Sequence, residues 1–181
     1  MSEIKHLTME ELEAGMDEIR QSPKEAGTLA LIVRRPESEK REVLEEGELS
    51  LEDGLVGDNW KTRGGSDAPN PNMQLNVMNA RSIALISPDK GRWPLAGDQL
   101  YVDLDLSDAN LPPGTRVGVG DAIIEVTAEP HNGCKKFVAR FGLDAMKWVN
   151  SDTGKQLHLR GINAKVVQPG TIRKGDVVKK L

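Results

Sequence analysis

Cysteine is almost absent from this chain of 181 residues, whose single thiol belongs to Cys134. One cysteine can form no internal disulfide, which is typical of proteins from a reducing compartment. It also excludes an iron–sulfur cluster, because such clusters are held by several cysteine thiolates. The first residues lack the positively charged start and apolar stretch of a secretory signal. We therefore expect a cytoplasmic protein.

Long apolar runs and blocks of positive charge are absent as well. No apolar stretch approaches the roughly 20 residues that span a bilayer, so no membrane association is expected. The net charge is −4 and lysine and arginine form no long run, which excludes the electrostatic footprint of a general nucleic-acid binder. Aromatic residues make up only 3% of the chain, so a hydrophobic core has to be mainly aliphatic. These properties predict a soluble protein and leave its oligomeric state open.

Short strands with glycine and proline between them dominate the chain after residue 28. Apolar and β-branched runs predict strands at 28–34, 42–45, 73–78, 99–104, 122–128, 162–168 and 177–179. Turns are indicated by Gly-Asp pairs at 57–58, 97–98, 120–121 and 175–176. Many short strands with such turns favour a barrel or a sandwich. We expect a mainly β fold with a few short helices.

Helices are expected at three places. Thr8 and Glu11 have the spacing of a capping box ahead of an amphipathic helix over 9–20. Further helices are expected at 79–86 and at 135–149, the latter broken by a glycine. The helices interrupt the strand pattern without replacing it.

The pattern divides the chain into two parts. Residues 1–27 are expected to form an N-terminal helical extension, and residues 28–181 a β-barrel domain. Within the second part, residues 58–72 form a polar loop without an apolar period. Loops of that length in a compact domain are often functional.

Cys134 lies in a segment that favours a reactive thiol. It follows a predicted strand and a Pro-containing turn, and a predicted helix begins just after it. The neighbouring residues are His131, Asn132, Lys135 and Lys136. A helix dipole and nearby cations stabilise a thiolate, which lowers the pKa of the thiol and makes the sulfur a nucleophile or a metal ligand. We interpret Cys134 as the catalytic residue.

Three other interpretations of Cys134 stay open. The thiol could be a small buried hydrophobic group, as free cysteines commonly are. His131 and Cys134 have the spacing of two metal ligands, although structural zinc needs four. A cysteine–histidine hydrolase pair, with His131 or His158 as the base, is the third alternative.

Polar residues near strand ends are further candidates for a binding site. Arg160 precedes a predicted strand, where its planar guanidinium could clamp an anion. Asp58 begins the long polar loop and could form the wall of a pocket. Gln74 and Asn76 share one face of a strand, and with Arg81 farther along they could line a polar cleft.

Five motifs, in this order, resemble the MOSC domain, which is named for the C-terminal part of molybdenum cofactor sulfurase. They are Gly-Leu-x-Gly-Asp at 54–58, Gly97-Asp98-Gln99, the segment from Pro130 to Cys134, Arg160-Gly161, and the closing run from Gly170 to Val178. The resemblance covers residues 28–181. It implies a fold built round a β-barrel.

The resemblance also implies a role in sulfur transfer or in binding the molybdenum cofactor, with Cys134 as persulfide carrier or metal ligand. In cofactor-binding relatives basic residues hold the pterin phosphate, a role implied here for Arg160 and Lys135. The candidate cofactor-binding residues are Asp58, Arg81, His131, Asn132, Lys135, Arg160 and Gly161.

Other functions follow from the same resemblance. Molybdenum-dependent reduction of N-hydroxylated compounds is one alternative, and a non-enzymatic module for small-ligand binding or assembly is another. The sulfurase also has a pyridoxal-phosphate desulfurase domain, for which this chain is too short. Pyridoxal phosphate could therefore act only through a partner. The implied partners are a cysteine desulfurase or an electron-transfer protein.

Two motifs depart from the family pattern. Gly97-Asp98-Gln99 stands where the family often has Gly-Glu-Asn. Around the sulfur, Pro130-His131-Asn132-Gly133-Cys134 replaces Pro-Arg-x-Pro-Cys. The loss of arginine and proline there leaves room for a different ligand.

Overall fold

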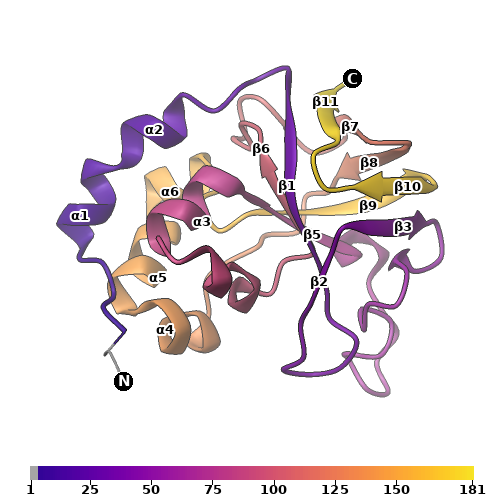
Figure 1. Ribbon diagram of the computed structural model, residues 1–181, viewed down its shortest axis with the longest axis horizontal. Helices are drawn as coiled ribbons and strands as arrows, with labels where there is room; N and C mark the ends of the chain where they lie inside the picture. Colours follow the sequence, from indigo (N-terminus) through magenta and orange to yellow (C-terminus); the bar gives the residue numbers. More distant parts are fainter. Residues whose placement is uncertain (1–3) are drawn as a thin grey trace.

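A closed ring of seven strands forms the centre of the molecule (Figure 1). The computed structural model describes residues 4–181. Around the ring the order is β11 (Val177–Lys180), β7 (Arg116–Val119), β8 (Ala122–Val126), β9 (Ile162–Gln168), β5 (Leu75–Asn79), β6 (Leu100–Asp103) and β1 (Ala26–Arg34). Pairing of β11 with β1 closes the ring, and only β5 and β6 run parallel. The expected mainly β barrel with short helices is confirmed.

Further strands extend this ring. Strand β2 (Glu42–Leu44) continues the ring sheet by pairing with β1. A separate small sheet contains β3 (Glu46–Ser50), β4 (Gly54–Leu55) and β10 (Gly170–Arg173). The sequence does not predict β7 or this small sheet, because their short strands carry glycines and charged residues that are typical of turns. The glycines of all four Gly-Asp pairs do have positive φ, between 53° and 92°.

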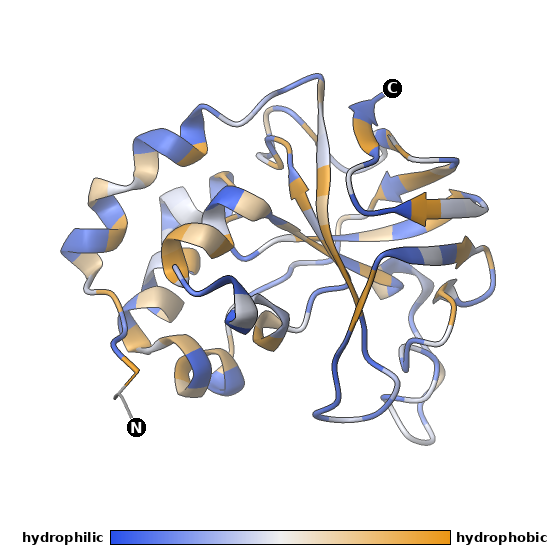
Figure 2. Cartoon of the chain, viewed as in Figure 1, coloured by the Kyte–Doolittle hydropathy of each residue, from blue (hydrophilic) through white to orange (hydrophobic). Residues whose placement is uncertain are grey.

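Alternation along the strands separates two hydrophobic cores. On β6, Leu100 and Val102 join one cluster, whereas Tyr101 between them joins the other. The first cluster consists only of leucine, isoleucine, valine and alanine, in agreement with the expected aliphatic core. The second cluster packs the helices against the barrel and contains Trp93, Tyr101, Phe137, Phe141 and Trp148. Figure 2 shows the resulting hydrophobic stretch along the lower part of β1.

Short helices surround one side of the barrel (Figure 1). They are α1 (Met9–Ala14), α2 (Met16–Arg20), α3 (Ala80–Ile86), α4 (Lys135–Phe141), α5 (Leu143–Val149) and α6 (Asp152–Gln156), with 3₁₀ turns η1 (Pro71–Met73) and η2 (Lys90–Ala96). None of the helices within residues 4–181 is long and apolar enough to cross a membrane. The division of the chain at residue 27 stays a prediction.

Two of the expected helices are interrupted at glycines. The helix expected over 9–20 is two helices separated at Gly15, where a Cβ would collide with the Leu85 side chain. The Thr8–Glu11 capping box at its start is present. The expected break near Gly142 separates α4 from α5, and its φ of 97° explains why the helix stops there.

Candidate functional site

Cys134 is the N-cap residue of α4 and its thiol is exposed. The segment before it is fixed on α5 through Asn150. The Gly133 N–H donates to Asn150 Oδ1 at 2.9 Å, and Asn150 Nδ2 donates back to the Gly133 carbonyl at 3.2 Å. A Cβ on Gly133 would press on Val149 at 3.1 Å. The glycine therefore lets the chain lie close to α5 and sets the position of the sulfur.

The pKa of the Cys134 thiol is lowered. Partial burial has the largest single effect and raises the pKa, but several interactions together outweigh it. These are the backbone N–H groups of Phe137 and Lys136 at the helix start, followed by the charges of Arg160 and Arg140. The helix start therefore has the larger lowering effect, and the two arginine charges add to it. The thiolate is thus favoured relative to an ordinary cysteine.

Replacing Arg140 with glutamine is expected to slow alkylation of Cys134 at neutral pH. Without this cation the pKa of the thiol rises, so less thiolate is present at any pH below it. The pH profile of the iodoacetamide rate, followed by mass spectrometry, measures the shift. Arg173→Gln is the control, because Arg173 is exposed and paired with Glu46. Profiles that coincide for the wild-type protein and Arg140→Gln would contradict the assignment.

A polar cavity of about 330 Å³ opens beside the thiol. Its walls come from the loop between β1 and β2, the 58–72 loop, the segment after η2, and α4. Five arginines line it: Arg35, Arg41, Arg63, Arg140 and Arg160. The pKa of Arg41 is lowered first by burial and then by the charges of Arg140 and Arg35. This mutual repulsion marks a cavity suited to an anion.

Arg35 is held at the end of β1 by a buried carboxylate. Its Nε and Nη2 donate to the two oxygens of Asp58 at 2.9 and 2.8 Å, and Nη1 donates to the Gly97 carbonyl at 2.9 Å. Asp58 also accepts from the Trp60 N–H at 3.1 Å and from Gln99 at 3.2 Å. The bidentate pair fixes the guanidinium at the cavity wall.

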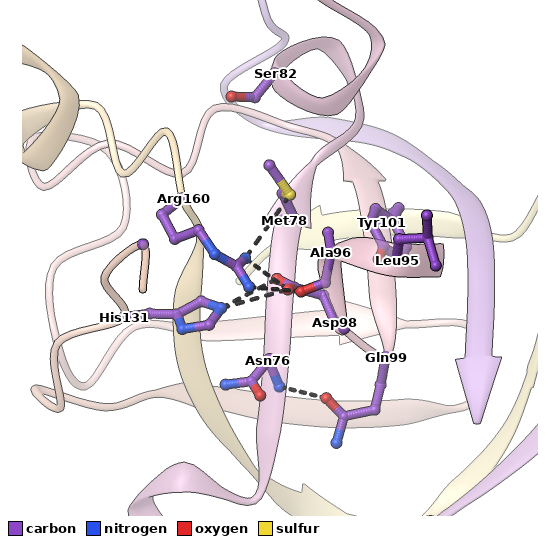
Figure 3. Close-up of polar contacts among 12 residues, drawn as sticks. Asn76, Met78, Ser82, Leu95, Ala96, Asp98, Gln99, Tyr101, His131 and Arg160 are labelled. Carbon is purple, nitrogen blue, oxygen red and sulfur yellow. Dashed lines mark hydrogen bonds and ion pairs between the residues drawn. The ribbon is translucent and has the colours of Figure 1, made fainter. Parts of the chain in front are cut away.

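Asp98 anchors two residues that line the cavity, Arg160 and His131 (Figure 3). It follows Gly97, whose φ of 89° turns the chain out of η2, and its side chain is completely buried. Arg160 donates to Asp98 Oδ1 at 2.6 Å and to the Ala96 carbonyl at 2.7 Å. His131 Nε2 lies 3.3 Å from Asp98 Oδ2. Arg160 and His131 thus share one carboxylate.

The protonation states follow from this arrangement. Burial raises the pKa of Asp98, but Arg160 and His131 outweigh it, so the carboxyl stays ionised. The pKa of His131 is lowered by burial first and by Arg160 second, so the imidazole is neutral at neutral pH. The buried pair of Asp98 and Arg160 is therefore the charged unit of this group.

Two buried polar atoms at the cavity lack a partner. Within residues 4–181, the buried side-chain atoms without a hydrogen bond are Asn59 Oδ1 and Arg160 Nε. Both residues line the cavity. Because buried polar groups are nearly always satisfied, these two atoms indicate a place for a polar ligand.

The structure brings four of the predicted site residues together. Cys134, His131, Asn132 and Arg160 all line the cavity. Asp58 does not line the cavity, but its carboxylate is paired with Arg35, which does. Arg160, which precedes β9, and His131, which precedes Cys134, are brought together by their contacts with the same carboxylate of Asp98.

Three other predicted residues do not line the cavity. Lys135 is exposed on α4 and its place is taken by Lys136. Gly161 lines a neighbouring cavity of about 320 Å³. Arg81 is paired instead with Asp103 at 2.8 Å, and it also donates to the Glu18 carbonyl at 3.0 Å. The Arg81 guanidinium therefore joins α3 and the N-terminal helices to the barrel.

The structure adds several residues to the site that the sequence did not indicate. They are Arg35, Arg41, Arg63, Arg140 and Asp98. The arginines come from separate segments and form no motif, so only the fold assembles them. Asp98 had two signals in the sequence, since it lies in one of the Gly-Asp pairs and in the Gly97-Asp98-Gln99 motif of the family resemblance.

The structure bears on all three alternative roles of Cys134: part of a hydrolase pair, metal ligand and buried hydrophobic group. His158 lines the neighbouring cavity, where Nδ1 lies 2.7 Å from the Leu106 carbonyl oxygen. No group of three His, Cys, Asp or Glu side chains placed to hold a metal occurs in the part of the chain that the structure describes. The thiol is exposed, which differs from the small buried hydrophobic group of the first interpretation.

Comparison with known proteins identifies the family. A family model described as the MOSC domain matches residues 70–179. The chain belongs to the MOSC domain family. The match includes Asp98, Cys134 and Arg160, whereas Arg35 and Asp58 of this MOSC protein lie before it. No curated protein matched the chain.

Solved structures support the same fold. The YuaD protein from Bacillus subtilis superposes with a TM-score of 0.59 at 15% identity, over 86% of this chain and 95% of that chain. YiiM from Escherichia coli gives 0.56 at 21% identity, over 85% and 69%. YiiM from Geobacillus stearothermophilus gives 0.58 at 15%, over 86% and 75%. At such low identity these similarities show only that this MOSC protein shares its fold with the three structures.

Proposed function

We propose that this MOSC protein binds a molybdenum cofactor in the arginine-lined cavity, with the Cys134 sulfur facing the metal. The observation that carries the proposal is the convergence of an exposed thiol of lowered pKa with five arginines on one cavity. The MOSC family is associated with this cofactor, and the cavity residues fit it in two respects.

The first respect is charge. A pterin phosphate is a dianion, and guanidinium groups bind phosphate through paired N–H donors. Arg41 and Arg140 are only partly engaged by protein carbonyls and carboxylates, so they have donors to offer, and Arg63 lines the same cavity. Arg35 and Arg160 are neutralised by buried aspartates, and they orient the cavity walls.

The second respect is the donor set. Bound molybdenum supplies a redox-active centre, for which a thiolate is a suitable ligand. The Cys134 thiol is exposed and its pKa is lowered, so it is prepared to act as that ligand. The unpartnered Arg160 Nε–H and Asn59 Oδ1 would hydrogen-bond polar atoms of the bound group. His131, neutral and held by Asp98, could accept a proton within the cavity.

Metal and pterin analysis of the purified protein tests this function. The full chain from molybdate-supplied cells is expected to contain both, in comparable amounts. Cys134→Ser should lose the metal and keep the pterin, whereas Arg41→Gln should lose both, because the phosphate contact is weakened. Arg173→Gln, away from the cavity, is the matched control. Wild-type protein that holds neither metal nor pterin would refute the proposal.

A sulfur-carrier role is the second candidate, favoured by the exposure of the thiol. It predicts that Cys134 gains one sulfur atom when the protein is incubated with a cysteine desulfurase and cysteine. Intact-mass analysis before and after reduction detects that persulfide. A desulfurase or an electron-transfer protein as partner, reduction of N-hydroxylated compounds, and a cytoplasmic location stay predictions.

A further inference from the structure

Glu39 lies at the outer end of the cavity that contains the thiol. It belongs to the loop between β1 and β2, and its side chain is among those that line the cavity. Glu39 Oε1 accepts from Lys136 Nζ at 3.2 Å, and Glu39 Oε2 accepts from Arg140 Nη2 at 2.9 Å. Lys136 and Arg140 lie one helical turn apart on α4 and also line the cavity. A carboxylate of the protein thus occupies two of its cations.

This carboxylate is placed where an anionic group of a ligand would bind. Arg140 is fixed by a second bond, in which Nη1 donates to the Leu95 carbonyl at 2.9 Å. Its Nη2 is therefore the donor that is directed to the cavity mouth, and Glu39 accepts from it. Arg41, whose Nε donates to the Pro94 carbonyl, lines the same cavity. A phosphate at this position would meet three cations.

Glu39 is also easily displaced. Its side chain is 62% exposed, and that of Lys136 is 66% exposed. Ion pairs in such positions contribute little to stability because water competes with them. Glu39 also has φ of 65°, a left-handed conformation that is unfavourable for a residue with a Cβ. Release of the carboxylate would let the loop relax from this conformation.

We propose that Glu39 is an internal competitor for anions, whose carboxylate occupies the Lys136–Arg140 end of the cavity until a phosphate group displaces it. A doubly charged phosphate has more acceptor oxygens and more charge than the carboxylate, so it can displace Glu39 where a singly charged anion cannot. The competitor thereby selects ligands with a phosphate group. Only the identity of the natural ligand rests on the proposed function.

Phosphate binding by the full chain tests this competition. Isothermal titration with inorganic phosphate, at constant ionic strength and neutral pH, gives the dissociation constant. Glu39→Gln is expected to bind phosphate about threefold more tightly, because two exposed ion pairs no longer compete. Glu37→Gln is the matched control from the same loop, since Glu37 pairs with Lys40 and does not line the cavity.

A double-variant cycle assigns the effect to the cavity. Lys136→Gln should weaken phosphate binding, and the gain from Glu39→Gln should shrink when Lys136→Gln is also present. Lys136 is exposed, so its replacement leaves the fold intact. The inference is overturned if Glu39→Gln does not tighten binding, if Glu37→Gln gives the same gain, or if no variant binds phosphate.

The outcomes separate this inference from the proposed function. Protein that holds no molybdenum or pterin, but binds phosphate more tightly as Glu39→Gln, would refute the cofactor proposal and keep the competitor. Protein that holds the cofactor, but whose phosphate affinity is unchanged in Glu39→Gln, would refute the competitor and keep the cofactor proposal.

Discussion

Replacing Arg160 with methionine is expected to lower the free energy of unfolding by about 3–5 kcal/mol at neutral pH, because it leaves a buried charge without its partner. Asp98 is completely buried, and Arg160 is the closest cation to it, at 2.6 Å. The second neighbour, His131, is neutral at this pH in the wild-type protein. Loss of Arg160 removes one cause of its lowered pKa, but burial, the larger cause, remains and opposes its protonation beside Asp98. Methionine keeps the apolar contact with Phe137, over whose ring the guanidinium now lies.

The destabilisation should depend on pH with a definite sign. In the wild-type protein the pKa of Asp98 is below its unfolded value, so its contribution is complete above that value and is lost as the pH falls through the folded pKa. Without Arg160, burial dominates and raises the folded pKa above the unfolded value. The folded variant then loses stability only at pH values above the unfolded pKa, where Asp98 is ionised in the unfolded chain. The difference in stability should therefore be largest at neutral pH and decrease as the pH falls toward the unfolded pKa of about 3.9. It should disappear only below that value, as the pH falls through the folded pKa of the wild-type protein.

Urea unfolding of both proteins across this range measures the difference. Arg173→Met removes an exposed ion pair and is expected to change the free energy of unfolding by less than about 1 kcal/mol at any pH. A loss that is equally large at pH 4 would show that packing, and not the charge of Asp98, accounts for the role of Arg160.

Gly161→Ala is expected to cost about 3 kcal/mol or more, the sum of backbone strain and overpacking. Gly161 has φ of 125°, a conformation that residues with a Cβ rarely adopt. An added Cβ would lie 2.4 Å from the Val77 carbonyl oxygen and 3.0 Å from both Asp98 Oδ2 and His131 Cδ2. The substitution would therefore push the Asp98–His131 pair away from Arg160.

Gly175→Ala separates the two causes. Gly175 also has positive φ, of 92°, but no atom lies within 4 Å of a Cβ there. Its substitution should cost only the strain, about 1–2 kcal/mol. Chemical denaturation compares the two variants, and the alkylation rate of Cys134 reports whether the cavity has changed in Gly161→Ala. Equal losses for the two glycines would mean that crowding around His131 does not matter.

The sequence predicts the barrel but not the assembly of its site. Strand alternation and Gly-Asp turns are local signals, and so is the position of Cys134 before a helix. The pairing of strands is not local. Arg81 follows β5 closely in sequence, yet its side chain reaches Asp103 on β6, because these two strands run side by side in parallel.

The two departures from the family pattern are in contact with each other. Asp98 replaces the glutamate and His131 replaces the arginine, and their side chains lie 3.3 Å apart. A shorter carboxylate thus meets a neutral ring instead of a second guanidinium. In the sequence these changes lie 33 positions apart and appear unrelated. Only the return of β9 beside β5 brings Arg160 to both.

The closure of the ring by β11 has a consequence for aggregation. Strand β11 covers the hydrogen-bonding edges of β1 and β7 at once. If it detached, two neighbouring strands would expose unpaired N–H and C=O groups, and these could recruit a strand from another molecule. The pairing of a few residues, Val177–Lys180, therefore protects the whole barrel from intermolecular β-sheet formation.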